Sequence, residues 1–206
     1  MPEINLSGNQ QKATVYRLLS ACFYQPEDRF VAEDLFGQLV NALNSSEPEL
    51  EDLAKSMKVA FCQPGTEKLL GDYSRLFLGP FEIPAKPYGS VYLDGEKVVM
   101  GDSTMKVKAC YRDAGFDVAE DFREMPDHIA VELEFLYLLS FRQNEALALD
   151  DSETVKRWQE FEQNFLQNHL GLWVEDFCRR ICDHAETDFY RLLAELTDKF
   201  VRQQKV

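Results

Sequence analysis

The residues best suited to chemistry gather around His128. His128 and Glu132 are four positions apart, which places both on one face of a helix, and Glu124 and Asp127 stand close by. Imidazole and carboxylate groups in this order could bind a divalent metal ion or act as an acid–base pair. A bare His–Glu pair at this spacing is more often a local hydrogen bond or ion pair. A metal- or nucleotide-dependent enzyme using Asp127, His128 and Glu132 is therefore the alternative interpretation.

The cysteines and glycines give no further support to an enzyme. Cys178 and Cys182 share a helical face near His184, but they lack the two paired-ligand turns of a structural zinc site and are interpreted as small core residues. The chain holds five scattered cysteines, an odd number that suits reduced thiols. Its glycines do not form a phosphate-binding loop pattern. We predict neither a catalytic residue nor a metal or other cofactor.

The charge of the chain restricts its partners. Asp and Glu number 36 against 22 Lys and Arg, a formal net charge of −14. This balance argues against nucleic acid or anionic lipid as partner and would attract a basic ligand, although acidity also simply keeps proteins soluble. The N-terminus carries no export signal, and Glu132 and Glu134 interrupt the longest apolar run. We expect a cytoplasmic protein without an integral membrane segment.

Hydrophobic periodicity predicts an all-α fold, a single bundle-like domain of several helices over residues 1–206. Pro126 should mark the first turn of a central helix, with Asp127 placing negative charge at its N-terminus. That helix is apolar on every face, as expected of a helix enclosed by others. Leu172 and Cys182 are expected to face inward. Residues 46–49 are expected to form a capping box, residues 150–153 to cap a later helix, and Gly115 to end another. The expected helices run over about 9–24, 29–43, 46–61, 66–77, 102–115, 126–141, 150–166, 169–184 and 187–200.

Residues 79–101 are expected to form a long loop rich in Pro and Gly. The density of these two residue types excludes a helix. Residues 91–99 fit the hairpin rule, with Asp94-Gly95 between β-prone runs, but a lone hairpin is marginal in water. We therefore expect an ordered loop with at most a small ribbon. A division of the domain into two lobes near 80–101 is a further interpretation.

Two interpretations of this loop and the start of the central helix stay open. The loop aromatics, the polar residues Asp127 and His128, and the acidity together suit a groove for a peptide that is basic at one end and apolar along its length. Alternatively the aromatics fill the core and Asp127 caps its own helix.

Several motifs at these positions resemble the TorD/DmsD family of cytoplasmic chaperones, also called redox enzyme maturation proteins. The combination is specific, although each piece alone is short, and it covers the chain from Leu69 onward. Tyr88 stands where DmsD-like members usually carry Trp. The matching motifs are Arg75–Pro80, Pro87–Asp94, Gly101–Thr104, Pro126–His128 and Phe189–Leu196.

The resemblance implies an all-α chaperone without catalytic activity. Its implied partner is the twin-arginine signal peptide of a molybdenum-cofactor oxidoreductase of the DMSO or TMAO reductase type. The chaperone would hold the apo catalytic subunit until cofactor insertion and folding are complete, before Tat export. The cofactor-insertion machinery is a further partner, and the implied oligomeric state is a monomer or a domain-swapped dimer. The signal-peptide contacts that the resemblance implies are Leu76, Phe77, Phe81, Pro87, Tyr88, Gly101, Asp127 and His128.

Overall fold

A computed structural model of the chain describes residues 6–44, 48–79, 82–95, 98–116 and 124–205. Within these ranges the chain is helical and contains no strand, so the predicted all-α fold is confirmed. The helices, with two π-helical segments labelled η, are α1 (Leu6–Cys22), α2 (Arg29–Ala32), α3 (Leu35–Leu43), α4 (Pro48–Cys62), α5 (Thr66–Tyr73), η1 (Ser74–Leu78), α6 (Gly89–Leu93), α7 (Asp102–Asp113), α8 (Ile129–Ala148), α9 (Ser152–Phe165), η2 (Leu166–Leu170), α10 (Gly171–His184) and α11 (Asp188–Gln204).

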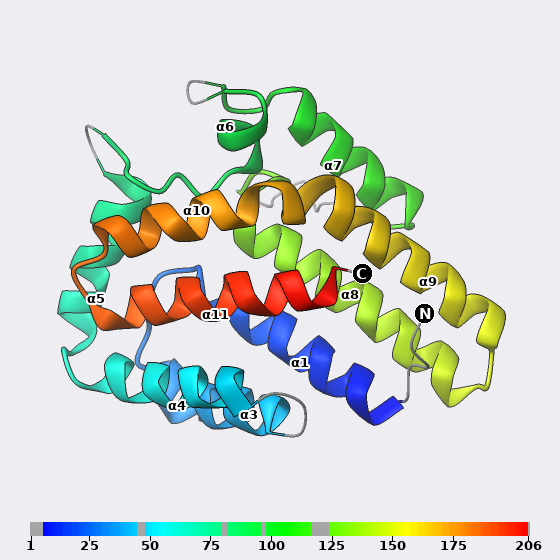
Figure 1. Cartoon of the computed structure of the whole chain (residues 1–206), viewed down its shortest axis with the longest axis horizontal. Helices are drawn as coiled ribbons and strands as arrows, with labels where there is room; N and C mark the ends of the chain where they lie inside the picture. The colour runs from blue at the N-terminus through cyan, green and yellow to red at the C-terminus, as the bar shows by residue number, and fades with distance from the viewer. Residues whose placement is uncertain (1–5, 45–47, 80–81, 96–97, 117–123, 206) are drawn as a thin grey trace.

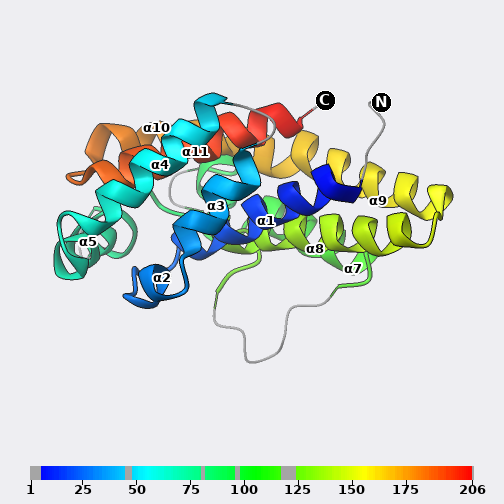
Figure 2. The same cartoon turned by 90° about the horizontal axis from the view of Figure 1, so that it is seen from below.

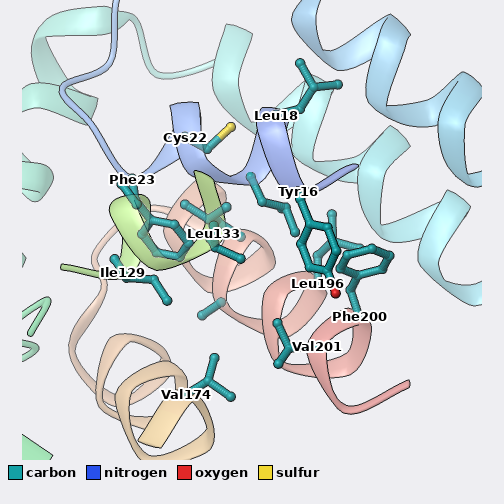
Figure 3. Packing of buried hydrophobic residues seen from close by; sticks show 14 of the residues in the cluster. Tyr16, Leu18, Cys22, Phe23, Ile129, Leu133, Val174, Leu196, Phe200 and Val201 are labelled. Atoms are coloured by element: carbon teal, nitrogen blue, oxygen red, sulfur yellow. The ribbon is translucent and has the colours of Figure 1, made fainter. Parts of the chain in front are cut away.

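The long helices pack side by side around one core. Helix α8 packs along α1 and α9, and α11 packs along α4 and α10. Helix α6 contacts both α10 and α7, and α6 and α7 lie at the top of the view in Figure 1. Buried side chains from both halves of the chain meet there, among them Tyr16, Phe23, Leu133 and Phe200 (Figure 3). This shared core forms a single helical domain, and the division into lobes near 80–101 stays a prediction.

Local end signals predicted several helix boundaries. The Asp151 carboxylate accepts a hydrogen bond from the Thr154 amide (3.0 Å) and caps α9, as expected. Gly115 has a φ of 78°, the left-handed backbone that ends α7. The capping box expected around Ser46 lies outside the described residues. Local chemistry at a helix end is therefore informative when few tertiary contacts compete with it.

Other expectations about the helices were wrong. The segment 29–43 is divided into α2 and α3 by Asp34, whose φ is 48°. Its carboxylate lies where a Cβ on Gly37 would be, so a larger residue at position 37 would require the exposed Asp34 side chain to turn away. Leu172 and Cys182 are exposed, because they flank the buried stripe of α10 that runs from Trp173 to Ile181.

The central helix is less enclosed than expected. Ile129, Leu133 and Leu136 on α8 are completely buried, but Glu134 is exposed and Phe141 is 44% exposed. Figure 2 shows α8 along one side of the molecule, with its full length in view. One side of α8 therefore faces solvent.

A buried carboxylate joins α5 to the start of α11. Asp72 accepts hydrogen bonds from the Thr187 amide and hydroxyl (both 2.8 Å) and from the Glu186 amide (3.0 Å). Arg75 pairs with the other Asp72 oxygen at 2.6 Å. The interaction fixes η1, which carries Leu76 and Phe77, against the α10–α11 turn.

A search of the described helices for a bilayer-spanning segment finds none with the required length and apolar character.

Candidate functional site

The loop before α6 is tied to the residues before α8 by an antiparallel bridge between Tyr88 and His128. The Gly89 amide donates to the Asp127 carbonyl oxygen (2.8 Å), and the Ile129 amide donates to the Pro87 carbonyl oxygen (2.9 Å). The pairing brings together Pro87, Tyr88, Asp127 and His128, four of the residues predicted as signal-peptide contacts.

The same pairing creates a helix where the sequence excluded one. Asp127 Oδ2 accepts from the Ser90 amide at 2.8 Å, which satisfies a donor in the first turn of α6. The expected ribbon at 91–99 is not formed by the described residues, because Gly89–Leu93 is helical. A partner distant in sequence thus overrides the local turn signal of Asp94-Gly95.

Helix α8 begins three residues later than expected. Its N-cap is His128, whose Nδ1 accepts from the Ala130 amide (3.1 Å), and its first residue is Ile129. Pro126 and Asp127 lie in a turn ahead of it, where the Pro126 carbonyl oxygen accepts from the Tyr111 hydroxyl (2.7 Å). The start at Pro126 was wrong because the bridge holds His128 in extended backbone, with ψ of 137°.

Asp127 lies beneath the surface in this structure. Its side chain is 0% exposed, and Oδ1 has no hydrogen-bond partner among the described residues. Glu132, 1% exposed, is close enough for electrostatic repulsion, and its Oε2 accepts from Trp173 Nε1 at 3.3 Å. Burial, and then the Asp127 charge, raise the pKa of Glu132 well above its usual value. Two acidic groups thus lie below the bridge without a cationic partner in the described chain.

His128 is held between two tyrosine rings. The Tyr24 ring stacks on the imidazole at 6.0 Å, and the Tyr88 ring meets it edge-on at 5.4 Å. Burial lowers the pKa of His128 to about 4, so the ring is neutral at neutral pH. His128 therefore orients Tyr88 rather than supplying a charge.

The part of this site that solvent reaches is formed by four side chains, which we call the tyrosine–acid surface: Tyr24, Tyr88, Glu124 and Glu134. Both tyrosines and Glu124 are half-buried, and Glu134 is exposed. Burial, Glu134 and Glu124 raise the pKa of Tyr24 to about 12, and burial with Glu124 and Asp127 also raises the pKa of Tyr88. The surface combines aromatic faces with a negative potential.

Sequence reasoning missed Tyr24 and Glu134. Tyr24 follows the end of α1, and Glu134 belongs to the exposed side of α8. Nothing in the local pattern connects the two positions. Only the packing of α1 along α8 places them at the same surface.

Leu76 and Phe77 lie deeper than a contact surface. They are 0% and 3% exposed, and the Phe77 ring packs against Tyr73 at 5.2 Å. The Leu76 carbonyl oxygen accepts from the Ala85 amide (3.2 Å), which ties the loop to η1. These residues support the loop from below.

The remaining two predicted contacts lie apart from the bridge or outside the described chain. A Cβ on Gly101 would approach Asp94 Oδ2 to 2.3 Å. That oxygen accepts from the Ser103 amide (2.9 Å) and hydroxyl (2.6 Å), so Gly101 gives room to the clamp at the start of α7. Phe81 is outside the described residues.

The geometry offers few of the free polar atoms that the enzyme interpretation requires. His128 Nδ1 and Glu132 Oε2 are both occupied by donors from the protein itself. Within the described ranges, no group of three or more His, Cys, Asp or Glu side chains is arranged to hold a metal ion.

Comparison with known proteins gives concordant matches. Residues 37–179 match the family described as nitrate reductase delta subunit. The chain is 31% identical over 185 residues to the Tat proofreading chaperone DmsD of Salmonella typhimurium, covering 89% of this chain and 84% of that protein. It is 29% identical over 206 residues to the chaperone protein TorD of Shewanella loihica, covering 94% and 91%.

A solved structure confirms the fold. The crystal structure described as a redox enzyme maturation protein from Archaeoglobus fulgidus superposes with a TM-score of 0.55, at 22% identity, over 92% of this chain and 93% of that one. The relatives carry the names of chaperones rather than of enzymes. The chain therefore belongs to the nitrate reductase delta subunit family, together with the TorD and DmsD chaperones.

Proposed function

We propose that this protein is a cytoplasmic chaperone that binds the twin-arginine signal peptide of a molybdenum-cofactor oxidoreductase. It would hold the apo catalytic subunit, of the DMSO or TMAO reductase type, until cofactor insertion and folding are complete, and only then release it to Tat export. The names of its relatives support a proofreading chaperone of the Tat pathway.

The tyrosine–acid surface is the observation that carries the proposal. An arginine guanidinium stacks well on an aromatic face and forms charge-assisted hydrogen bonds with carboxylates. Tyr24 and Tyr88 offer half-buried rings, and Glu124 and Glu134 offer carboxylates beside them. A pair of adjacent arginines would find both kinds of partner at this one place.

The residues beneath this surface then have a positioning role. Asp127 anchors α6 through the Ser90 amide, and the His128 imidazole fixes the Tyr88 ring. Leu76 and Phe77 support the loop through Ala85 and Tyr73. Substitutions at these buried positions would weaken peptide binding by moving Tyr88, even though the peptide does not touch them in this conformation.

The test is a calorimetric titration of the protein with a synthetic twin-arginine leader. We expect saturable 1:1 binding, and a leader with both arginines replaced by Gln should bind at least about tenfold more weakly, because charge-assisted pairs contribute more than about 1.4 kcal/mol. Equal affinity of the two peptides would contradict the proposal. Sedimentation of the free protein and the complex would distinguish a monomer from a domain-swapped dimer.

A further inference from the structure

The two carboxylates of the tyrosine–acid surface have different surroundings. Glu124 is half-buried and comes directly before a turn, which the His128 amide closes by donating to the Met125 carbonyl oxygen (3.0 Å). Glu134 is exposed on α8. Neither side chain has a hydrogen-bond or ion-pair partner among the described residues. Both carboxylates can therefore receive a cation from another molecule, but only Glu124 would do so in partly desolvated surroundings.

More tyrosine rings lie near Glu124 than near Glu134. Burial and then the Glu124 charge raise the pKa values of Tyr73 and Tyr88, and that of Tyr73 reaches about 12. Burial, then Glu134 and then Glu124 raise the pKa of Tyr24. A charge shifts a pKa strongly only at short range. Of these three rings, all lie near Glu124, whereas Glu134 lies near Tyr24.

The ring near Glu134 is also partly covered. Tyr24 stacks on the His128 imidazole with an angle of 16° between the two planes, so the imidazole takes one face of the Tyr24 ring. Tyr88 meets the same imidazole at 67°, which is an edge contact rather than a stack. Tyr73 is buried and offers a ligand no open face. The place beside Glu124 and Tyr88 therefore suits a flat cation better than the place beside Glu134.

We infer that the tyrosine–acid surface distinguishes the two arginines of the leader: the position at Glu124 requires arginine, whereas the position at Glu134 accepts lysine. The inference rests on the proposed function and assigns its specificity to one carboxylate. A guanidinium is flat and weakly hydrated, so it can stack on a tyrosine ring and form two parallel hydrogen bonds with a carboxylate. An ammonium is a strongly hydrated point charge, and it would lose more hydration beside Glu124 while gaining neither of these contacts.

At Glu134 the two kinds of cation are close to equivalent. Water solvates both partners of an exposed ion pair, so such a pair contributes little, and its strength depends mainly on charge. Lysine supplies the same charge as arginine at this position. The leader would therefore need arginine at one position of the pair and only a positive charge at the other.

The experiment measures the Kd of the unchanged protein for four synthetic leaders, which carry Arg-Arg, Lys-Arg, Arg-Lys or Lys-Lys at the pair. We expect one of the two single replacements to weaken binding about tenfold and the other to change it by less than about twofold. The Lys-Lys leader should bind like the weaker of the two singly replaced leaders. The identity of that weaker leader also shows which arginine of the pair lies at Glu124.

Two variants assign the specificity to a carboxylate. Glu124→Gln and Glu134→Gln are a matched pair, because each removes one charge and nearly keeps the size of the side chain. Thermal melting should show both variants folded like the unchanged protein, since neither carboxylate has a partner in the described part of the chain. In Glu124→Gln the cost of the sensitive replacement should fall below about twofold, whereas Glu134→Gln should retain the cost of about tenfold.

Three results would overturn the inference. The first is an equal cost of the two single replacements in the unchanged protein, and the second is no cost for either of them. The third is a preference for arginine that persists in Glu124→Gln or disappears in Glu134→Gln. Failure of the proposed function itself has a different signature, since the Arg-Arg leader would then bind no better than the leader with both arginines replaced by Gln.

Discussion

Two buried aspartates each join segments that are distant in sequence, and their hydrogen bonding is very different. Asp72 receives hydrogen bonds from two amides and a hydroxyl and pairs with Arg75. Asp127 receives one, from the Ser90 amide, and its Oδ1 has no partner among the described residues. Both carboxylates are at most 3% exposed, so burial alone does not explain the contrast.

The contrast separates a structural junction from one that we propose to be functional. A completely satisfied buried network rigidifies the elements it joins, and the Asp72 cluster does so for α5, η1 and α11. A partly satisfied group costs stability, and the regions that carry such costs are those that bind or move. Asp127, in the bridge between Tyr88 and His128, is such a partly satisfied group, and it lies under the surface that we propose to bind the leader.

The largest expected effect on stability is at Asp72, the aspartate whose hydrogen bonds are all satisfied. Asp72→Ala should lower the free energy of unfolding by about 3–5 kcal/mol, because it leaves Arg75 and the Thr187 and Glu186 amides without their acceptor. Urea denaturation measures this, with the exposed Asp52→Ala as control. A loss below about 1 kcal/mol would show that the two aspartates do not differ as described.

The next largest effect is an acid-dependent loss of stability at His128, in the bridge next to Asp127. Folded His128 has a pKa of about 4 against 6.5 when unfolded, so the unfolded chain binds the proton first as the pH falls. The stability that neutral His128 contributes to the folded state is fully present above about pH 6.5. It is lost progressively as the pH falls toward 4, by about 3 kcal/mol in total. Glu132 acts in the opposite direction, because its raised pKa lets the folded state keep a proton that the unfolded chain releases.

Urea titrations between pH 7 and pH 4 would isolate the His128 contribution by comparing the unchanged protein with His128→Gln at each pH. The variant should lose less stability on acidification, whereas the exposed His184→Gln should follow the unchanged protein. Parallel curves for all three proteins would mean that the His128 ring does not titrate as its burial requires.

A smaller effect is expected at Gly89, which packs against the buried acid. An added Cβ would lie 2.9 Å from Trp173 Nε1 and 3.3 Å from Glu132 Oε1. Gly89→Ala should therefore cost about 1–3 kcal/mol of stability through overpacking. Gly71, which has nothing within 4 Å of its Cβ position, gives the matched control, since Gly71→Ala should be neutral or stabilising in α5.

The sequence predicted those features that depend on neighbouring residues. The α9 cap at Asp151, the stop at Gly115 and the all-α class follow from local chemistry and periodicity. The family motifs also indicated Pro87, Tyr88, Asp127 and His128, which the fold brings together.

What the sequence could not predict depends on partners distant along the chain. Helix α6 forms because Asp127 accepts a hydrogen bond from the Ser90 amide in its first turn. Helix α8 begins at Ile129 because the bridge to Tyr88 holds His128 in extended backbone. The burial of Asp127 could not be predicted either, because a charged residue next to a proline locally indicates the start of a helix. Tyr24 joins the surface only through packing of α1 along α8.

The central claim is that the tyrosine–acid surface receives the arginine pair, and a double-mutant cycle tests it directly. The Kd values of the unchanged protein and of a Glu124→Gln, Glu134→Gln variant would be measured with the twin-arginine leader and with its Gln-substituted form. We predict a coupling free energy above about 1 kcal/mol between these carboxylates and the arginines. A coupling indistinguishable from zero, with leader binding otherwise intact, would contradict the account.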